Sequence, residues 1–170
     1  MNYKYVIVIL VLLAAAAWWF LHDNPEAEVR NAHQELTRLL SKTEDDPSST
    51  MILNARLLQG LFADNCEVTG DAEMLAGSYT SEEMVSTIIR VQGMFQSIEL
   101  TFHELEVEFP APDDAITSFT AVLIGQSQVT GEDKAGETRE VISRMRKVDG
   151  KWLFTEFRLA NVVSPDDRSQ

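Results

Sequence analysis

The sequence predicts a domain of the α+β class, in which three helices pack on a strongly bent antiparallel sheet, with one transmembrane helix before the domain. Three observations lead to this prediction. Apolar residues in the first half recur every three or four positions, as they do on one face of a helix. From about residue 97 onward apolar and polar residues alternate, which is typical of half-buried strands. Asp149-Gly150 then separates two such strands, and this dipeptide is a strong hairpin signal.

The chain begins with an apolar segment, Tyr5–Leu21, that contains no charged residue. As a helix it would be ~25 Å long, close to the lower limit for crossing a ~30 Å hydrocarbon core. Lys4 precedes the segment and acidic residues follow it, which favours a cytoplasmic N-terminus and an extracytoplasmic domain. A cleaved signal peptide is the main alternative, with Ala14–Ala16 or Ala15–Ala17 as the cleavage site, and a buried helix is another.

These observations divide the chain into three parts. Residues 1–22 form the transmembrane anchor, residues 23–163 form the folded domain, and residues 164–170 form a disordered polar tail. The anchored protein would be a single-pass membrane protein, and its domain would be periplasmic in a bacterium. Tyr5–Leu21 is therefore the predicted contact with the membrane.

Composition excludes one class of partner. The chain has 14 Lys and Arg against 27 Asp and Glu, for a net charge of −13, and it has no basic run. Such a surface repels phosphate backbones, so we expect no nucleic-acid partner. Cys66 is the only cysteine, which rules out an intramolecular disulfide. We expect it to be a small buried hydrophobic residue, with an intermolecular disulfide or a reactive thiol as the alternatives.

Start signals place the three helices. Asn24-Pro25-Glu26 combines a capping side chain, a proline at the first helical position and an acidic first turn, and His33 lies beside the apolar face that follows. A second helix is predicted from about Ser49 to Gln59, followed by a short strand over Leu61–Val68. Thr80-Ser81-Glu82-Glu83 is a capping box that opens the third helix.

The first long strand, Ser97–Phe109, contains a break in its alternation. Its apolar positions change face between His103 and Glu104, which requires an inserted residue, so we predict a β-bulge and a bend there. Ala115–Val129 is the second long strand. Thr138–Val148 and Lys151–Val163 form the final hairpin, in which Lys147 lies over Trp152 as a cation–π pair.

A two-residue turn fixes the register of this hairpin. On one face the predicted pairs are Lys147 with Trp152, Met145 with Phe154, Ser143 with Glu156, and Val141 with Arg158. On the opposite face they are Arg146 with Leu153, Arg144 with Thr155, and Ile142 with Phe157.

Three segments carry a resemblance to a known family: Leu61–Asp64 at the first strand, Ser81–Met84 at the third helix, and Arg146–Phe154 at the hairpin. With these segments the chain resembles the NTF2-like superfamily, which includes the SnoaL-like and ketosteroid-isomerase-like proteins, over roughly Pro25 to Val163. The resemblance implies a cone, in which helices cross the concave side of the sheet and leave a conical pocket. It implies little about activity, because the superfamily contains enzymes, binding proteins, scaffolds and dimerising modules.

A few polar residues are candidates for the pocket. His103 lies at the predicted bend, where a bulge could turn it inward, and Ser143, Glu156 and Arg158 form a polar cluster in the hairpin register. Tyr79 is the only tyrosine outside the anchor segment. Each also has a structural interpretation, as a cross-strand pair or a surface residue. His103-Glu104 lacks a second histidine at metal-binding spacing, so no metal or cofactor is predicted.

No catalytic set can be assigned from these residues. Ketosteroid-isomerase-like chemistry needs a carboxylate base facing an acidic hydrogen-bond donor, and the long strands carry no aspartate in their interiors. The sequence therefore favours a non-enzymatic, membrane-tethered module for binding a membrane-protein partner or for self-association as a homo-oligomer. The alternative is a small-molecule-binding protein or an isomerase- or hydratase-like enzyme with a polar pocket around His103, Glu156 and Arg158. Convergence of His103 and Glu156 would favour the enzyme, and a pocket filled by Phe and Met side chains would favour the module.

Overall fold

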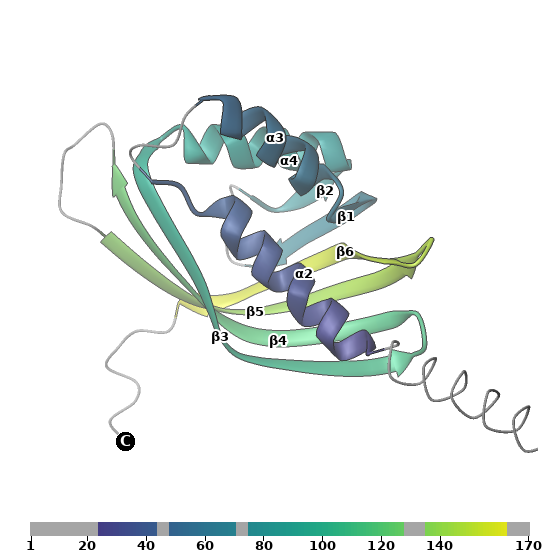
Figure 1. The fold of residues 1–170 in the computed structure, drawn as a ribbon. Coiled ribbons are helices and arrows are strands. Elements are labelled where there is room, and N and C mark those ends of the chain that lie inside the picture. Colours follow the sequence, from purple (N-terminus) through teal and green to yellow (C-terminus); the bar gives the residue numbers. More distant parts are fainter. Residues whose placement is uncertain (1–23, 44–47, 71–74, 128–134, 163–170) are drawn as a thin grey trace, which may run out of the picture.

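The computed structural model describes residues 24–43, 48–70, 75–127 and 135–162. The predicted anchor and the predicted tail lie outside these residues. No helix within the described ranges is long and apolar enough to cross a membrane. The described part holds three helices and one curved sheet, with the helices gathered over the concave side of the sheet (Figure 1).

The helices begin where the sequence signals place them. Helix α2 spans Pro25–Leu40, and the Asn24 side chain accepts a hydrogen bond from the amide of Ala27 at 3.1 Å. Helix α3 spans Ser48–Gln59, and helix α4 spans Ser81–Gln92. Both halves of the capping box between Thr80 and Glu83 are present at the start of α4. Local capping chemistry therefore fixes the starts of two of the three helices.

Six strands form one sheet in the order β2-β1-β6-β5-β4-β3. Their bounds are Phe62–Gly70 for β1, Gly77–Tyr79 for β2, Phe95–Ala111 for β3, Asp114–Ser127 for β4, Ala135–Val148 for β5 and Lys151–Val162 for β6. Neighbours pair in antiparallel fashion except β1 and β6, which are parallel. The prediction of a wholly antiparallel sheet is therefore wrong at this one junction, where the last strand returns beside the first.

The strand register shifts at several points of the sheet, and two of these bulges bear on the predictions. The first is the predicted one, because the β3–β4 register shifts between His103 and Glu106, and Glu104 has a φ of 56°. The second lies in β6, where Arg144 pairs with Glu156 while Met145 pairs with Phe154, so that Thr155 is the extra residue. Curvature at these points produces the strongly bent strands seen in Figure 1.

The β6 bulge corrects half of the predicted hairpin register. Between the turn and the bulge the prediction is confirmed, since Lys147 pairs with Trp152, Met145 with Phe154, and Arg146 with Leu153. Beyond Thr155 every predicted pair is wrong: Ser143 pairs with Phe157, Arg144 with Glu156, Ile142 with Arg158, and Val141 with Leu159. One inserted residue moves the following side chains to the opposite face, because side chains alternate along a strand.

The core lies between the concave face of the sheet and the helices. Its most buried side chains come from both layers: Val29, Leu36, Leu39, Leu58, Phe62, Cys66, Met145 and Phe154. Cys66 is fully buried, as predicted, and burial raises the pKa of its thiol to about 12. Near the hairpin end, Glu28 of α2 accepts hydrogen bonds from Lys147 Nζ and Trp152 Nε1, each at 2.9 Å. The predicted cation–π pair is also present, with Lys147 Nζ 5.8 Å from the Trp152 ring centroid.

Candidate functional site

A cavity of about 360 Å³ lies inside the cone, between the helices and the concave face of the sheet. Its lining is almost wholly aliphatic and aromatic, with main contributions from Leu36, Leu40, Val68, Met84, Ile88, Leu100, Phe102, Phe119, Ala121, Leu123, Val141, Phe157 and Leu159. Inward positions of the strands supply most of these side chains, because each strand presents alternate residues to the concave face. Such a lining is suited to an apolar molecule.

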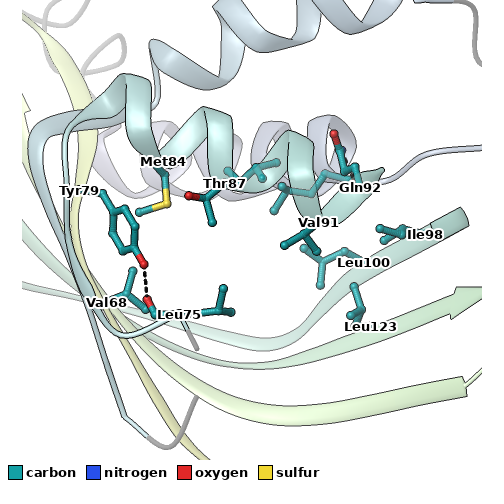
Figure 2. Close-up of a pocket in the computed structure, with 12 residues that line it drawn as sticks. Val68, Leu75, Tyr79, Met84, Thr87, Val91, Gln92, Ile98, Leu100 and Leu123 are labelled. Atoms are coloured by element: carbon teal, nitrogen blue, oxygen red, sulfur yellow. Dashed lines mark hydrogen bonds between the residues drawn. The ribbon is translucent and has the colours of Figure 1, made fainter. Parts of the chain in front are cut away.

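An adjoining chamber of about 210 Å³ extends beneath α4 and shares part of this lining (Figure 2). Val91 of α4 faces Leu100 and Leu123 across it, and Met84 of α4 lies at the other end, toward Val68 and Leu75. Tyr79 lies at the wall of this chamber, where its hydroxyl donates a hydrogen bond to the backbone oxygen of Leu75 at 2.9 Å. The Tyr79 hydroxyl is thus already engaged by the protein.

The charged groups in the described lining of the larger cavity are Glu137 and Arg139. Both occupy inward positions of β5, in the same alternation as Val141 and Ser143. Arg139 Nε donates a hydrogen bond to Glu137 Oε1. Arg139 Nη1 is shielded from solvent and has no hydrogen-bond partner among the residues that the structure describes. A buried donor left without an acceptor costs ~1–3 kcal/mol, and more when the group is charged.

His33 forms a second polar group deeper in the core. Its Nδ1 lies 2.9 Å from the backbone oxygen of Val29, which can only accept, so Nδ1 carries the proton. Its Nε2 therefore accepts from a hydroxyl, with Thr117 Oγ1 at 3.0 Å and Ser143 Oγ at 3.3 Å. The two hydroxyls are 2.7 Å apart. All three side chains are buried, and each is satisfied by the others or by the backbone.

Burial keeps the His33 ring neutral. The pKa of His33 is lowered from 6.5 to about 4, chiefly by loss of hydration and to a smaller extent by the nearby Arg30, against the opposing effect of the hydrogen bond to Val29. The ring also contacts aromatic edges, with its centroid 6.0 Å from Phe102 and 5.3 Å from Phe119. Those two rings line the cavity as well, whereas His33 is 1% exposed and is not among the described residues of the lining.

The sequence-predicted site residues do not come together. His103 is exposed on β3, an edge strand, and its Nε2 lies 3.2 Å from Thr101 Oγ1. Glu156 is in ion pairs with Arg144 at 3.1 Å and with Arg158 at 3.3 Å. Because of the Thr155 bulge, Glu156 and Arg158 lie on the convex face, whereas Ser143 points into the core. The predicted polar pocket around His103, Glu156 and Arg158 is therefore not formed, although Tyr79 does line the cavity region.

Two groups escaped prediction for different reasons. His33 is four residues after Val29 and three before Leu36, so its spacing matches the buried stripe, although its polarity argued against that position. Arg139 lies two residues before Val141 on the inward face of β5. The sequence places Arg139 at the start of the predicted strand Thr138–Val148, where a charged residue needs no special explanation.

Comparisons with known proteins identify the fold. No family model and no curated protein matches the sequence. Among solved structures, a putative scytalone dehydratase from Novosphingobium aromaticivorans DSM 12444 is similar with a TM-score of 0.67 and 14% identity, covering 82% of this chain and 85% of that one. The hexachlorocyclohexane dehydrochlorinase LinA-type3 from Novosphingobium barchaimii LL02 has a TM-score of 0.65 and 14% identity over 82% of this chain and 87% of its own.

A third structure, a putative dehydratase from the NTF2-like family from Streptomyces avermitilis, has a TM-score of 0.64 and 12% identity, covering 84% of this chain and 99% of that chain. Together these matches confirm that the described domain has the NTF2-like fold, as the resemblance in the sequence implied. At such low identities the likeness establishes the fold alone.

Proposed function

We propose that this domain binds an apolar small molecule in the cavity of its cone and that the protein does so as a non-enzymatic, membrane-tethered module. The observation that carries the proposal is the cavity itself. Its volume of about 360 Å³ lies within the range of ~300–1,000 Å³ that is usual for small-molecule sites. Its lining offers an apolar ligand a favourable transfer from water, at roughly 25 cal/mol per Å² of surface removed.

The lining argues for binding rather than catalysis. Proton transfer needs a group whose pKa lies near the working pH and within hydrogen-bond reach of the ligand. Of the two charged residues in the described lining, Arg139 cannot serve as a base, because a guanidinium stays protonated in proteins, and the carboxylate of Glu137 already accepts a hydrogen bond from Arg139 Nε. His33 is buried and is not among the described residues of the lining.

The tether belongs to the same proposal. If Tyr5–Leu21 holds the domain beside a bilayer, it raises the effective concentration of the cavity toward molecules that partition into membranes. Apolar ligands are of this kind.

A second candidate is a dehydratase-like enzyme. It is favoured by the names of the compared structures, which include putative dehydratases and dehydrochlorinases. In such an enzyme His33, together with the hydroxyls of Thr117 and Ser143, would have to reach the ligand, although His33 is not among the described residues of the lining.

The test is a calorimetric titration of the full chain in lipid nanodiscs with octanol, using empty discs as the blank. In Ala121→Phe a ring would fill the cavity, whereas in Thr120→Phe, the next position along β4, the same ring would point toward the opposite face. We expect saturable binding to the wild type and to Thr120→Phe, and at least tenfold weaker binding to Ala121→Phe. Absence of binding to the wild type, or equal binding by all three proteins, would contradict the proposal.

A further inference from the structure

The cavity has one charged corner in an otherwise apolar lining. Arg139 and Glu137 point inward from the start of β5, with Arg139 opposite Ala121 and Glu137 opposite Leu123 of β4. Ala121 and Leu123 are cavity-lining residues, so the guanidinium lies directly beside the apolar space. A polar group in such a position fixes the orientation of a ligand, because it is the one place where the ligand's own polar end can be accommodated.

The guanidinium has donors to spare at this corner. Its Nε is used by Glu137, but within the described part of the chain Nη1 is shielded from water and has no hydrogen-bond partner. Buried donors in proteins nearly always have an acceptor, so an unpaired one calls for an explanation. An acceptor supplied by a ligand explains it, because the donor would then be satisfied in the bound protein.

The relative exposure of the two side chains indicates where that acceptor enters. The side chain of Glu137 is 46% exposed, whereas that of Arg139 is 23% exposed. Glu137 therefore holds the guanidinium from the solvent side, which leaves the cavity side of Arg139 for a ligand. This arrangement also positions the planar guanidinium, so less side-chain freedom is lost when a ligand binds.

Resting on the function proposed above, we propose that the ligand is an apolar molecule that ends in a single carboxylate, with Arg139 as the residue that binds the carboxylate. A guanidinium forms its strongest hydrogen bonds with carboxylates, which it can grip through two parallel N–H···O bonds. The apolar remainder of the ligand then extends along Ala121 and Leu123 into the cavity. Glu137 has two opposing effects on binding. It orients Arg139, and its own negative charge repels the carboxylate of the ligand.

The experiment compares octanoate with octanamide, its neutral counterpart of the same length, on the full chain in nanodiscs at pH 7.5. For the wild type we expect octanoate to bind at least tenfold more tightly than octanamide. Arg139→Met should remove this preference while leaving octanamide affinity within about twofold, and Arg139→Lys should keep part of it. Glu137→Gln should strengthen octanoate binding severalfold, because it removes the nearby negative charge.

The outcomes separate this inference from the proposed function. If octanol and octanamide bind but octanoate has no advantage, or if Arg139→Met keeps the preference, the carboxylate assignment is wrong and the apolar site stands. If none of the three ligands binds the wild type, the proposed function itself fails. Binding of octanol by the Arg139→Met variant shows that this variant has folded. If Arg139→Met does not fold, the Arg139→Lys variant is used in its place.

Discussion

The enclosed His33 ring should make the domain sensitive to mild acid. In the folded protein burial lowers the pKa of His33 to about 4, whereas the unfolded chain has the ordinary value of 6.5. Between these values the unfolded state binds a proton that the folded state does not bind. Stability attributed to His33 is therefore complete above about pH 6.5 and is lost progressively as the pH falls toward 4.

The size of the effect follows from the same shift. The difference of 6.5 − 4 = 2.5 units corresponds to about 3 kcal/mol at about 1.4 kcal/mol per unit. Most of it should already be evident at pH 5, where we expect the free energy of unfolding to be about 2 kcal/mol lower than at pH 7 because of this one group. That is a large part of the stability of an ordinary domain.

The assay is urea unfolding of the full chain in mild detergent at pH 7, 6 and 5, followed by circular dichroism. Other groups also titrate, so the informative quantity is the difference between the wild type and His33→Gln. That difference should shrink by about 2 kcal/mol between pH 7 and pH 5. A difference that stays constant over this range would refute the reasoning. If His33→Gln does not fold, the His33 ring signals in an NMR titration of the wild type decide, and titration near pH 6.5 would be the refuting result.

Three further substitutions or modifications test the packing. Phe154→Ala removes a fully buried ring and should lower the free energy of unfolding in urea by ~3–5 kcal/mol. Phe109→Ala, at a residue that is 37% exposed, should lower it by about 1 kcal/mol or less. Equal losses in the two variants would contradict the assigned core. Gly70→Ala would place a Cβ 1.9 Å from a backbone oxygen of β6. It should therefore lower the free energy of unfolding by at least ~2 kcal/mol more than Gly150→Ala, where φ is also positive but the space around the residue is open. Cys66, with its pKa raised to about 12, should react with a disulfide reagent at least ~100-fold more slowly in the native protein than in urea, and fast native labelling would show that the thiol is accessible.

Much of the fold could be predicted because it depends on local chemistry. The Asn24 cap, the Thr80–Glu83 capping box and the Asp149-Gly150 turn each act within a few residues, and each is present as expected. The bulge near Glu104 was also visible, because the alternation of apolar residues changes phase there. In these cases the residues that carry the sequence signal are also the residues that form the cap, turn or bulge in the structure.

The site was harder to predict because it depends on distant pairings. The bulge at Thr155 has a weaker local signature than the one near Glu104, because the apolar positions change phase from Trp152 and Phe154 to Phe157 and Leu159, but the apolar Leu153 obscures the change. The pairing of β6 with β5 and β1 shows which face each residue takes. One shifted residue was enough to move Glu156 and Arg158 away from Ser143, and with them the expected polar pocket.

His33 shows the complementary difficulty. Its two hydroxyl partners lie 84 and 110 positions away in the sequence, so nothing near His33 indicates that a buried imidazole is satisfied. The sequence placed His33 only beside the apolar face; its own helix supplies the acceptor, the backbone oxygen of Val29, and the tertiary fold supplies the hydroxyl donors.

The most direct test of the account is where an apolar ligand contacts the protein. The measurement is a set of nuclear Overhauser effects between octanol and the protein's methyl groups, using the full chain in nanodiscs. We expect contacts to the methyls of Leu100, Ala121 and Leu123 inside the cone and none to those of Ile124 and Ile142, which are exposed on the convex face. Contacts confined to Ile124 and Ile142, or absent from all five residues, would contradict the claim that the cone holds the ligand.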